Sequence, residues 1–210
     1  MKCAVCGEIL VEQEVIEALG HDFINGECSR CDAVKDAPFT DVPVGAFYFD
    51  PVEWAVEEGI TTGATDTTFD PNGNCLRGHV VTFLWRAAGS PEPTTTENPF
   101  TDVKEGDFFY KAVLWAVEKG ITNGTSATEF SPYKECNRAQ VVTFLWRAEG
   151  SPASAAEVSF TDVKPGQFYT AAVAWAVENG ITNGMGDGIF GVSTVCNRAQ
   201  VVTFLYRAMG

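Results

Sequence analysis

The stretch CNRAQVVTFLWRA at residues 136–148 returns as CNRAQVVTFLYRA at residues 196–208 and, changed at its start, as CLRGHVVTFLWRA at residues 75–87. The sequence before each copy repeats too, because a Phe-Thr-Asp-Val motif opens at Phe39, Phe100 and Phe160. A fixed period of about 60 residues indicates one supersecondary unit used three times. Such a unit presents the same chemical group several times, which favours binding over catalysis.

Each repeat is predicted to contain two helices. In the second repeat, Val113, Ala116 and Val117 form one apolar helical face. Gly120 follows as a C-cap, so the first helix is expected at about residues 109–119. The quoted stretch forms the second helix, and its wide apolar face predicts a bundle in which each repeat packs against the next.

The start of the second helix is well specified in two of the three repeats. Asn137 and Gln140 form a capping-box pattern, which Asn197 and Gln200 repeat. The first repeat has Leu-Arg-Gly-His at residues 76–79 instead. Its second helix is therefore expected to be weaker by about 1–2 kcal/mol.

The composition predicts a folded, soluble chain that avoids polyanions. Of 210 residues, 45% are apolar, and 28 acidic against 14 basic residues give a formal net charge of -14. This charge repels nucleic acids and anionic lipid headgroups. No apolar run is long enough to span a membrane, and no signal-peptide core follows Met1. We expect the chain to be a mature fragment of a longer exported protein.

Four cysteines near the N-terminus predict a metal site. They form the pattern C-x2-C-x21-C-x2-C at Cys3, Cys6, Cys28 and Cys31. This is close to the spacing by which two knuckles hold a tetrahedral zinc ion. Zinc could supply on the order of 10 kcal/mol to a segment too short for a core of its own. Two disulfides or a rubredoxin-like iron site are the alternatives, and His21 is interpreted as a turn residue rather than a ligand.

The other three cysteines occupy equivalent positions in the repeats, directly before the second helix. They are Cys75, Cys136 and Cys196. A lone cysteine in such a place is typically a small buried hydrophobic residue. Equivalent positions in separate units seldom come close enough for a disulfide, so pairing among them is not expected. A three-cysteine metal site on a pseudo-threefold axis is a further alternative.

Together these motifs resemble the S-layer homology module. The resemblance covers residues 39–210, with Phe-Thr-Asp-Val, Trp-Ala-Val, Gly-Ile-Thr-x-Gly and a closing Trp-Arg-Ala helix, and three tandem copies are typical of the family. The family signature Ile-Thr-Arg-Ala-Glu corresponds here to Cys-Asn-Arg-Ala-Gln, which keeps Arg138 and Arg198. In the first repeat only Arg77 of this signature survives cleanly.

The resemblance implies a pseudo-threefold, three-pronged helical domain on the envelope of Gram-positive and related bacteria. Such domains bind secondary cell-wall polysaccharide, often pyruvylated, in grooves between neighbouring repeats. The candidate glycan-binding residues are Arg77, Arg138, Arg198, Gly63, Gly124, Gly184, Trp54, Trp115 and Trp175.

The chemistry of these residues is suitable for an acidic sugar. A guanidinium at a helix N-terminus offers fixed donors to a carboxylate such as a pyruvyl ketal. The glycines would let a sugar approach the backbone, and the tryptophans could stack on a pyranose face. The alternatives are that the glycines form turns and that the tryptophans belong to the core. Because the first repeat departs from the pattern, Arg138 and Arg198 are expected to contribute more to binding than Arg77.

The aspartates of the Phe-Thr-Asp-Val motifs have a predicted structural role. They are Asp41, Asp102 and Asp162, one in each repeat. An aspartate in this position is expected to cap the local turn that follows the phenylalanine.

Other classes of function are less well supported. The chain has two histidines and no recognisable catalytic motif, so we expect it not to be an enzyme. The acidic leader argues against a nucleic-acid module, and the Asp-rich loops lack EF-hand spacing for calcium. A protein-interaction or surface-lattice module built on the same repeats is the alternative function that stays open.

The sequence therefore predicts a mainly α fold made of three helix-loop-helix repeats in a pseudo-threefold bundle, after a small metal-knuckle segment. The expected divisions are residues 1–36 for the zinc-ribbon-like leader and residues 37–90, 98–151 and 158–210 for the repeats. The expected partner is cell-wall polysaccharide, with structural zinc as cofactor. The expected location is the extracellular cell wall or S-layer of a Gram-positive-type bacterium.

Overall fold

The computed structural model describes residues 2, 4–7 and 20–210 of the chain. In this part the secondary structure is mainly α, as predicted, with two helices in each repeat. The helices are α1 (Phe49–Glu57), α2 (Arg77–Ala87), α3 (Tyr110–Glu118), α4 (Arg138–Ala148), α5 (Thr170–Glu178) and α6 (Arg198–Met209). The strands β1 (Phe23–Ile24) and β2 (Glu27–Cys28) form one short antiparallel hairpin before them.

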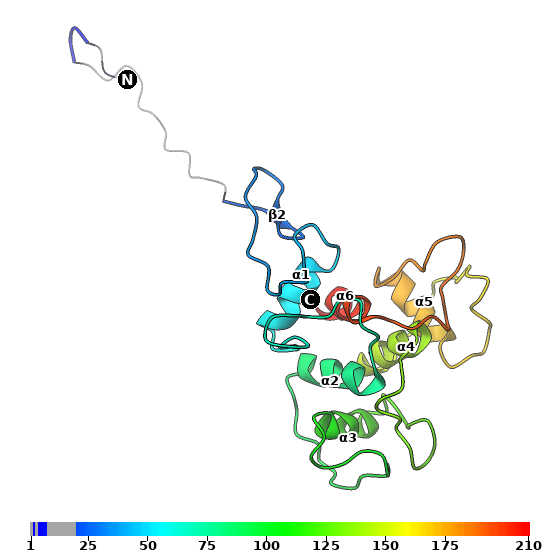
Figure 1. The fold of residues 1–210 in the computed structure, drawn as a ribbon. Coiled ribbons are helices and arrows are strands. Elements are labelled where there is room, and N and C mark those ends of the chain that lie inside the picture. Colours follow the sequence, from blue (N-terminus) through cyan, green and yellow to red (C-terminus); the bar gives the residue numbers. More distant parts are fainter. Residues whose placement is uncertain (1, 3, 8–19) are drawn as a thin grey trace.

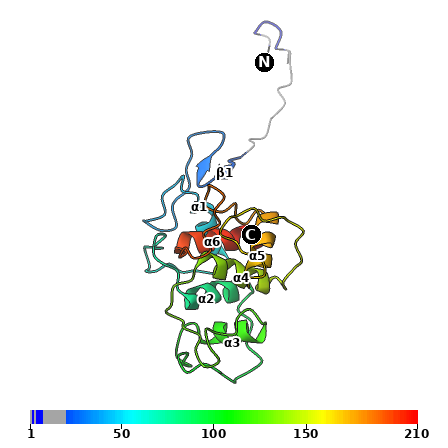
Figure 2. The ribbon, with the colours of Figure 1, turned by 90° about the vertical axis from the view of Figure 1, so that its right-hand side faces the viewer.

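The helices pair across repeat boundaries. The first helix of each repeat packs on the second helix of the repeat before it, so that α3 lies on α2 and α5 on α4. The same rule closes the molecule, because α1 of the first repeat packs on α6 of the third (Figure 1). The helices α2, α4 and α6 also contact one another at the centre (Figure 2). The result is three prongs around a central trio of helices.

None of these helices, among the residues described, is long and apolar enough to cross a membrane. The longest is α6 with 12 residues, whereas a helical span needs about 20.

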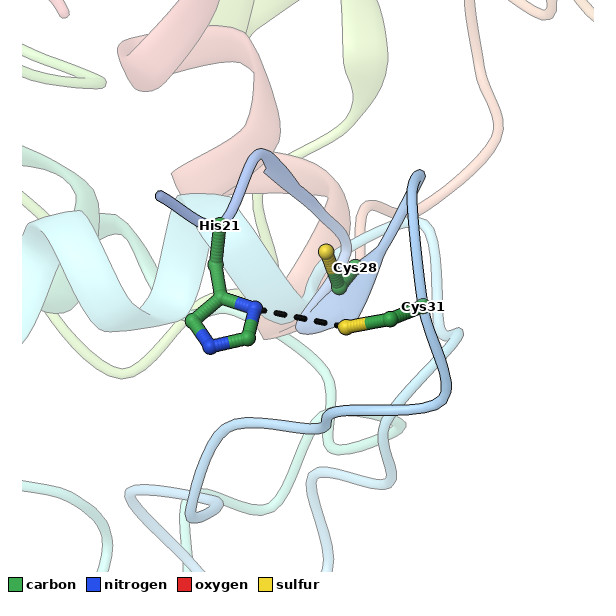
Figure 3. A group of neighbouring side chains, drawn as sticks. All are labelled: His21, Cys28 and Cys31. Atoms are coloured by element: carbon green, nitrogen blue, oxygen red, sulfur yellow. Dashed lines mark hydrogen bonds between the residues drawn. The ribbon is translucent and has the colours of Figure 1, made fainter. Parts of the chain in front are cut away.

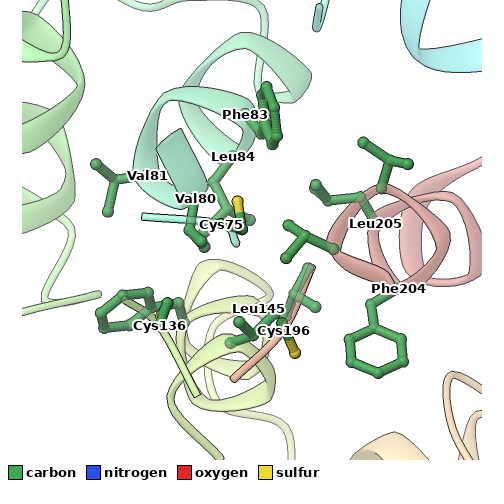
Figure 4. Close-up of a cluster of buried hydrophobic side chains, with 14 of the residues drawn as sticks. Cys75, Val80, Val81, Phe83, Leu84, Cys136, Leu145, Cys196, Phe204 and Leu205 are labelled. Carbon is green, nitrogen blue, oxygen red and sulfur yellow. The ribbon is translucent and has the colours of Figure 1, made fainter. Parts of the chain in front are cut away.

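A ring of backbone hydrogen bonds marks the pseudo-threefold axis. The Cys75 N–H donates to the Cys196 carbonyl at 2.8 Å, the Cys136 N–H to Cys75 at 3.0 Å, and the Cys196 N–H to Cys136 at 3.0 Å. The three thiols are free and fully buried among Val, Leu and Phe side chains (Figure 4). Burial raises the pKa of Cys75 and of Cys196 to about 12, so these thiols stay protonated. The prediction of small buried hydrophobic residues is confirmed.

The predicted difference in helix capping is also confirmed. Asn137 accepts a hydrogen bond from the Gln140 N–H at 2.9 Å, and Gln140 closes the capping box at the start of α4. The helix α2 begins after Leu76 without a side-chain cap. Gly78 in its first turn has a packing reason that the sequence does not reveal, because a Cβ there would lie 3.0 Å from Cδ1 of Phe109. Because glycine has no side chain, α2 can lie close to Phe109, the residue that precedes α3.

The aspartates of the Phe-Thr-Asp-Val motifs bind a later loop rather than the local turn predicted from the sequence. In the second repeat, Asp102 accepts hydrogen bonds from the N–H groups of Phe130 and Ser131 at 2.9 and 2.7 Å. Asp162 does the same in the third repeat, where burial opposes ionisation but the backbone donors still lower its pKa. Each carboxylate therefore fixes the loop that carries the phenylalanine contacted by an arginine of another repeat.

Candidate functional site

Each predicted arginine is the first residue of a central helix and reaches into the next repeat. The Nε–H of Arg77 donates to the Phe130 carbonyl at 3.0 Å, and that of Arg138 to Phe190 at 2.9 Å. The Arg198 Nε–H donates to the Phe69 carbonyl at 2.8 Å, which links the third repeat to the first. The arginines thus join the repeats in a closed cycle. The carbonyl partners could not be predicted because they lie in other repeats.

The guanidinium groups are buried against aromatic rings. Arg77 and Arg138 are each 3% exposed and Arg198 is 7% exposed. Each group lies over two phenylalanine rings at 4.8 to 5.5 Å, a geometry that stabilises a cation. Burial lowers the pKa of all three, but an arginine remains charged at neutral pH.

The three arginines differ in how many of their donors are used. The Arg138 Nη2 donates to Thr182 Oγ1 at 3.0 Å. The Nη2 atoms of Arg77 and Arg198 are buried but have no hydrogen-bond partner among the residues that the structure describes. A buried donor without a partner costs about 1–3 kcal/mol, so these two atoms distinguish Arg77 and Arg198 from Arg138.

Arg198 lines a cavity of about 330 Å³ that we call the repeat-1 groove. The loop of residues 61–64, which includes Gly63, forms one wall, and α2 forms another. Phe108 from the second repeat completes the lining, so the groove combines groups from all three repeats.

Arg77 lines an equivalent cavity of about 430 Å³, the repeat-2 groove. Its walls are the loop of residues 122–125, which includes Gly124, and α4. Phe168 from the third repeat occupies the place that Phe108 has in the repeat-1 groove. The structure therefore pairs each arginine with the glycine loop of the following repeat, not of its own.

A second set of arginines was not singled out from the sequence. Arg86 lines the repeat-1 groove and Arg147 the repeat-2 groove. Their Nη1 atoms donate to the carbonyls of Ile60 and Ile121 at 3.0 Å, and Arg207 makes the same bond in the third repeat. The signal was present as the Arg of each closing Trp-Arg-Ala or Tyr-Arg-Ala. The repeat-2 groove therefore holds three basic residues, Arg77, Arg147 and Lys134, whereas the repeat-1 groove holds two arginines and one carboxylate, that of Asp70.

The loop glycines have a steric reason to be glycine. Gly63, Gly124 and Gly184 have φ values of +96°, +82° and +84°. A Cβ at Gly124 would lie 2.5 Å from Cε1 of Phe100, and the other two would meet the equivalent phenylalanine at 2.6 Å. Backbone strain and packing thus account for these residues, and two of them also line grooves.

The predicted tryptophans lie on the first helix of each repeat and are largely covered. Trp115 is 5% exposed and Trp175 is 6% exposed. Trp54 is half-buried and meets Tyr206 edge-on at 5.6 Å between centroids. None of the three lines the repeat-1 or repeat-2 groove. The burial of Trp115 and Trp175 leaves little ring face on which a sugar could stack, whereas Trp54 lines a separate cavity of about 340 Å³ together with Arg86.

Exposed phenylalanines, which the sequence analysis did not select, line the two grooves. Phe108 and Phe168 are each 56% exposed and line the two grooves. Phe47, at the equivalent place in the first repeat, is 55% exposed. The repeated aromatic pair before each first helix was the sequence signal for them.

The repeat-1 groove contains a titratable group that the other repeats lack. His79 stands where the other repeats have glutamine, and its Nδ1 is buried without a hydrogen-bond partner in the described part of the chain. Its ring stacks on Phe108 at 5.5 Å between centroids. Burial, and then the Arg198 charge, lower the pKa of His79 below its usual 6.5.

A separate group of possible metal ligands lies in the leader. The ligand atoms of His21, Cys28 and Cys31 all lie within 4.8 Å of one another (Figure 3). Cys6 is an exposed free thiol outside this group, and Cys3 lies outside the described residues. The backbone N–H groups of Arg30 and Asp22 lower the pKa of Cys28 to about 6, which favours the thiolate that a metal requires. The central cysteines of the three-cysteine alternative are not among the metal-ligand groups found in the part of the chain that is described.

Comparison with known proteins gives a consistent match. A family model described as the S-layer homology domain matches residues 38–81, 99–142 and 159–202. A "Surface-layer 125 kDa protein" of Lysinibacillus sphaericus is 30% identical over 146 residues, which is 67% of this chain and 12% of that protein.

Two further relatives carry different names. A "Cell surface protein" of Thermoanaerobacter kivui is 31% identical over 117 residues, 53% of this chain and 15% of the relative. An "Endoglucanase" of Bacillus sp. (strain KSM-635) is 32% identical over 111 residues, 53% of this chain and 12% of the relative. The chain thus spans only 12% to 15% of the length of these three relatives.

Proposed function

The chain belongs to the S-layer homology family, and from this membership we propose that it is a non-catalytic module that binds secondary cell-wall polysaccharide in its inter-repeat grooves. The family match and the surface-protein relatives put the chain at the cell surface, in the cell wall or S-layer of a Gram-positive-type bacterium. We further propose that it is an exported piece of a larger protein, which it holds on the wall. We also propose the division of the chain into a leader of residues 1–36 and repeats of residues 37–90, 98–151 and 158–210.

The observation that carries the proposal is the pair of buried guanidinium groups, each with an unused donor, among the residues that line the two grooves. Arg77 lines the repeat-2 groove and Arg198 the repeat-1 groove, and the Nη2 atom of each is buried with no hydrogen-bond partner among the described residues. In each groove a second arginine and the N-terminus of a central helix add positive potential, in a chain whose net charge is -14. Lys134 adds to this potential in the repeat-2 groove, and Asp70 offsets part of it in the repeat-1 groove. Such a groove selects an anionic group on an otherwise neutral ligand.

A carboxylate on a sugar matches this arrangement. Pyruvyl ketals supply one carboxylate each, and a guanidinium donates to a carboxylate with charge-assisted hydrogen bonds. The rim phenylalanines Phe108 and Phe168 provide an exposed ring on which the apolar face of a pyranose can lie. In this proposal the buried tryptophans hold the first helices in place, and the glycines keep the loop close to the ligand.

The proposal changes the expected order of importance among the arginines. The sequence favoured Arg138 and Arg198 because the first repeat departs from the family pattern. In the structure, Arg77 lines a groove with the loop of the second repeat, which keeps the capping-box pattern. The Nη2 of Arg138 already donates a hydrogen bond to Thr182. We therefore expect Arg77 and Arg198 to bind the glycan more strongly than Arg138.

The first test is co-sedimentation of the chain with purified Gram-positive sacculi. Three preparations are compared: intact walls, walls stripped of secondary polysaccharide, and walls depyruvylated by mild acid. Binding that disappears on stripping supports a glycan anchor, and binding that falls on depyruvylation supports the pyruvyl group as the anion. Equal binding to intact and stripped walls would contradict the proposal.

Conservative variants then test the grooves. Lysine keeps the charge and can still donate to the phenylalanine carbonyl, but its single nitrogen cannot reproduce the geometry in which Nε and Nη2 of arginine donate to two separate acceptors. Arg77→Lys and Arg198→Lys should weaken wall binding about tenfold or more, as expected for the loss of a charged hydrogen bond. Arg138→Lys is the matched control. Equal losses at all three positions, with unchanged melting temperatures, would reject the proposed ranking.

A protein-interaction or surface-lattice module is the second candidate. The exposed rings Phe47, Phe108 and Phe168, one per repeat, give it a specific basis, because exposed aromatic residues are enriched in protein interfaces. Absence of binding to any wall preparation from a plausible host would favour this candidate over the glycan anchor.

We also propose that the leader carries one structural zinc ion. Thiolate and imidazole are the donors that structural zinc prefers, and the leader brings both types together. The ion would stabilise a segment whose only regular structure, among the residues described, is a hairpin of two-residue strands. The family match begins at residue 38, so the proposed zinc ligands lie outside the part of the chain that matches the family.

A further inference from the structure

The hairpin of the leader brings three metal-binding side chains to one end. Its turn is Asn25–Gly26, with φ values of +51° and +81°, the chemistry that closes a two-residue hairpin. The register places Cys28 on β2 opposite Phe23 on β1. His21 comes just before β1, and Cys31 lies in the turn after β2.

The distances agree with tetrahedral zinc. The Nδ1 of His21 lies 3.4 Å from the Sγ of Cys31 (Figure 3). Zinc–ligand bonds of usual length at tetrahedral angles put a nitrogen and a sulfur ligand about 3.6 Å apart. All three ligand atoms lie within 4.8 Å of one another, so a small inward movement would suffice.

The surrounding backbone supports the same arrangement. The Arg30 N–H points at the Cys28 Sγ at 3.5 Å, a contact suited to an anionic sulfur ligand. The Cys28 N–H donates to the Ala33 carbonyl at 2.9 Å and fixes the loop that carries Cys31. The His21 ring lies against Phe23, with centroids 5.3 Å apart. A backbone hydrogen bond thus orients the Cys28 sulfur, ring packing orients His21, and the loop that carries Cys31 is held by its backbone.

The opposite end of the hairpin is attached to the first repeat. The Asn25 N–H donates to Asp50 Oδ2 at 2.8 Å, and the Gly45 N–H donates to the Asn25 carbonyl at 2.8 Å. The backbone of Gly26 packs against the buried ring of Phe49 and leaves no space for a side chain, because a Cβ there would be 2.6 Å from Cε1 of that ring. These contacts bind the turn to α1, whereas the ligand end is held by hydrogen bonds within the leader, such as that from the Ser29 N–H to the Asp22 carbonyl at 2.8 Å.

We propose that His21, Cys28 and Cys31 bind one zinc ion and that this ion fixes the hairpin that packs on α1. The inference rests on the zinc proposed for the leader and deepens it, because it makes His21 a ligand. The sequence pattern alone assigns the ligands to the four cysteines and interprets His21 as a turn residue. The two ligand sets predict different results when His21 is removed.

The test measures metal affinity in the full chain under reducing conditions. Zinc content and competition with a colorimetric chelator are compared for the unaltered chain, His21→Ala, Cys28→Ser and Cys31→Ser. His79→Ala is the matched control, because the chain has two histidines and His79 lies in the repeat-1 groove. Each of the three ligand variants should weaken zinc binding at least about tenfold, and the control should not.

Cobalt substitution gives a second readout that a loss of folding would not imitate. The visible bands of bound Co²⁺ report its ligand set, so His21→Ala should shift them while the thiolate charge-transfer band from Cys28 and Cys31 remains. Unchanged zinc affinity and an unchanged cobalt spectrum in His21→Ala would overturn the histidine ligand and leave the zinc proposal standing. Failure of the unaltered chain to bind zinc would overturn both.

The structural role of the ion is tested by amide hydrogen exchange. The N–H groups of Cys28 and Lys35 are bonded within the hairpin region, to the Ala33 and Gly26 carbonyls. Removal of zinc should speed their exchange, while amides of α3 and α4 keep their rates. Equal exchange at Cys28 and Lys35 with and without bound zinc would overturn the proposed fixing of the hairpin.

Discussion

Gly124 combines a left-handed backbone with a neighbour that leaves no space for a side chain. Its φ is +82°, and a Cβ would lie 2.5 Å from Cε1 of Phe100. We expect Gly124→Ala to lower the free energy of unfolding by about 3 kcal/mol, because backbone strain and overpacking add.

Gly120 is the matched control for this prediction. Its φ of +69° is also left-handed, but nothing lies within 4 Å of its Cβ position. Gly120→Ala should cost only about 1 kcal/mol. Urea unfolding of both variants measures the difference, and equal losses would show that packing against Phe100 contributes nothing.

The exposed and the buried aromatic residues of a repeat should respond in opposite ways to removal. Phe168 is 56% exposed at the rim of the repeat-2 groove, so Phe168→Ala should weaken wall binding and leave stability nearly unchanged. Trp115 is 5% exposed, and Trp115→Ala should cost about 3–5 kcal/mol of stability. Sedimentation and thermal unfolding of both variants separate the effects. Full wall binding by Phe168→Ala would remove the ring from the proposed site.

Sequence reasoning identified the arginines but not what they contact. The repeat pattern selects Arg77, Arg138 and Arg198 because each heads a helix in the same register. Their carbonyl partners lie 52 to 129 residues away along the chain. No local rule specifies such partners, and the difference in donor use at Arg138 depends on a threonine from another repeat.

At the scale of helices, the capping boxes allow a direct measurement. Asn137→Ala removes the side chain that accepts from the Gln140 N–H. The loss should be about 1 kcal/mol by chemical denaturation. Asn137→Asp retains the acceptor and is the control, so a similar loss in both variants would show that the hydrogen bond does not stabilise α4.

The half-buried His79, in the first turn of α2, should make the stability of the chain depend on pH. Its pKa in the folded chain lies below 6.5, so the unfolded chain takes up a proton at higher pH than the folded chain does. The stability contribution is complete above pH 6.5 and is lost as the pH falls toward the folded pKa. The charged groups that share its groove are Arg198, Arg86 and Asp70.

His79→Gln should remove this dependence, because glutamine stands at the equivalent positions of the other repeats. Melting temperatures between pH 7.5 and pH 5 give the comparison. The unaltered chain should lose more stability over this range than the variant. Parallel curves would exclude His79 as the titrating group.

The sequence predicted individual helices well and their packing partners poorly. The expected first helix at residues 109–119 compares with α3 at Tyr110–Glu118, since periodicity and a glycine C-cap are local signals. The pairing of α3 with α2 of the preceding repeat is not local. An apolar face shows that a helix is buried but not which helix covers it.

For the whole molecule, the closed arrangement predicts a single unfolding transition. The helix α6 packs on α1, and Leu205 within α6 is 1% exposed. Leu205→Ala should cost about 2–5 kcal/mol and lower the melting temperature of all three repeats together. Calorimetry with hydrogen exchange at α1, α3 and α5 tests this. A separate early transition of the third repeat would contradict cooperative closure.

The ring of cysteine backbones has a consequence for how many repeats the family architecture can hold. In an open solenoid, units can be added at either end because each contacts only its neighbours. Here the Cys196 carbonyl already accepts the Cys75 N–H, and α6 already covers α1. A fourth repeat could pack on α1 or α6 only if the contact between these two helices were broken. The geometry therefore fixes copy number, so that in evolution such chains should lengthen by gaining whole triplets rather than single repeats.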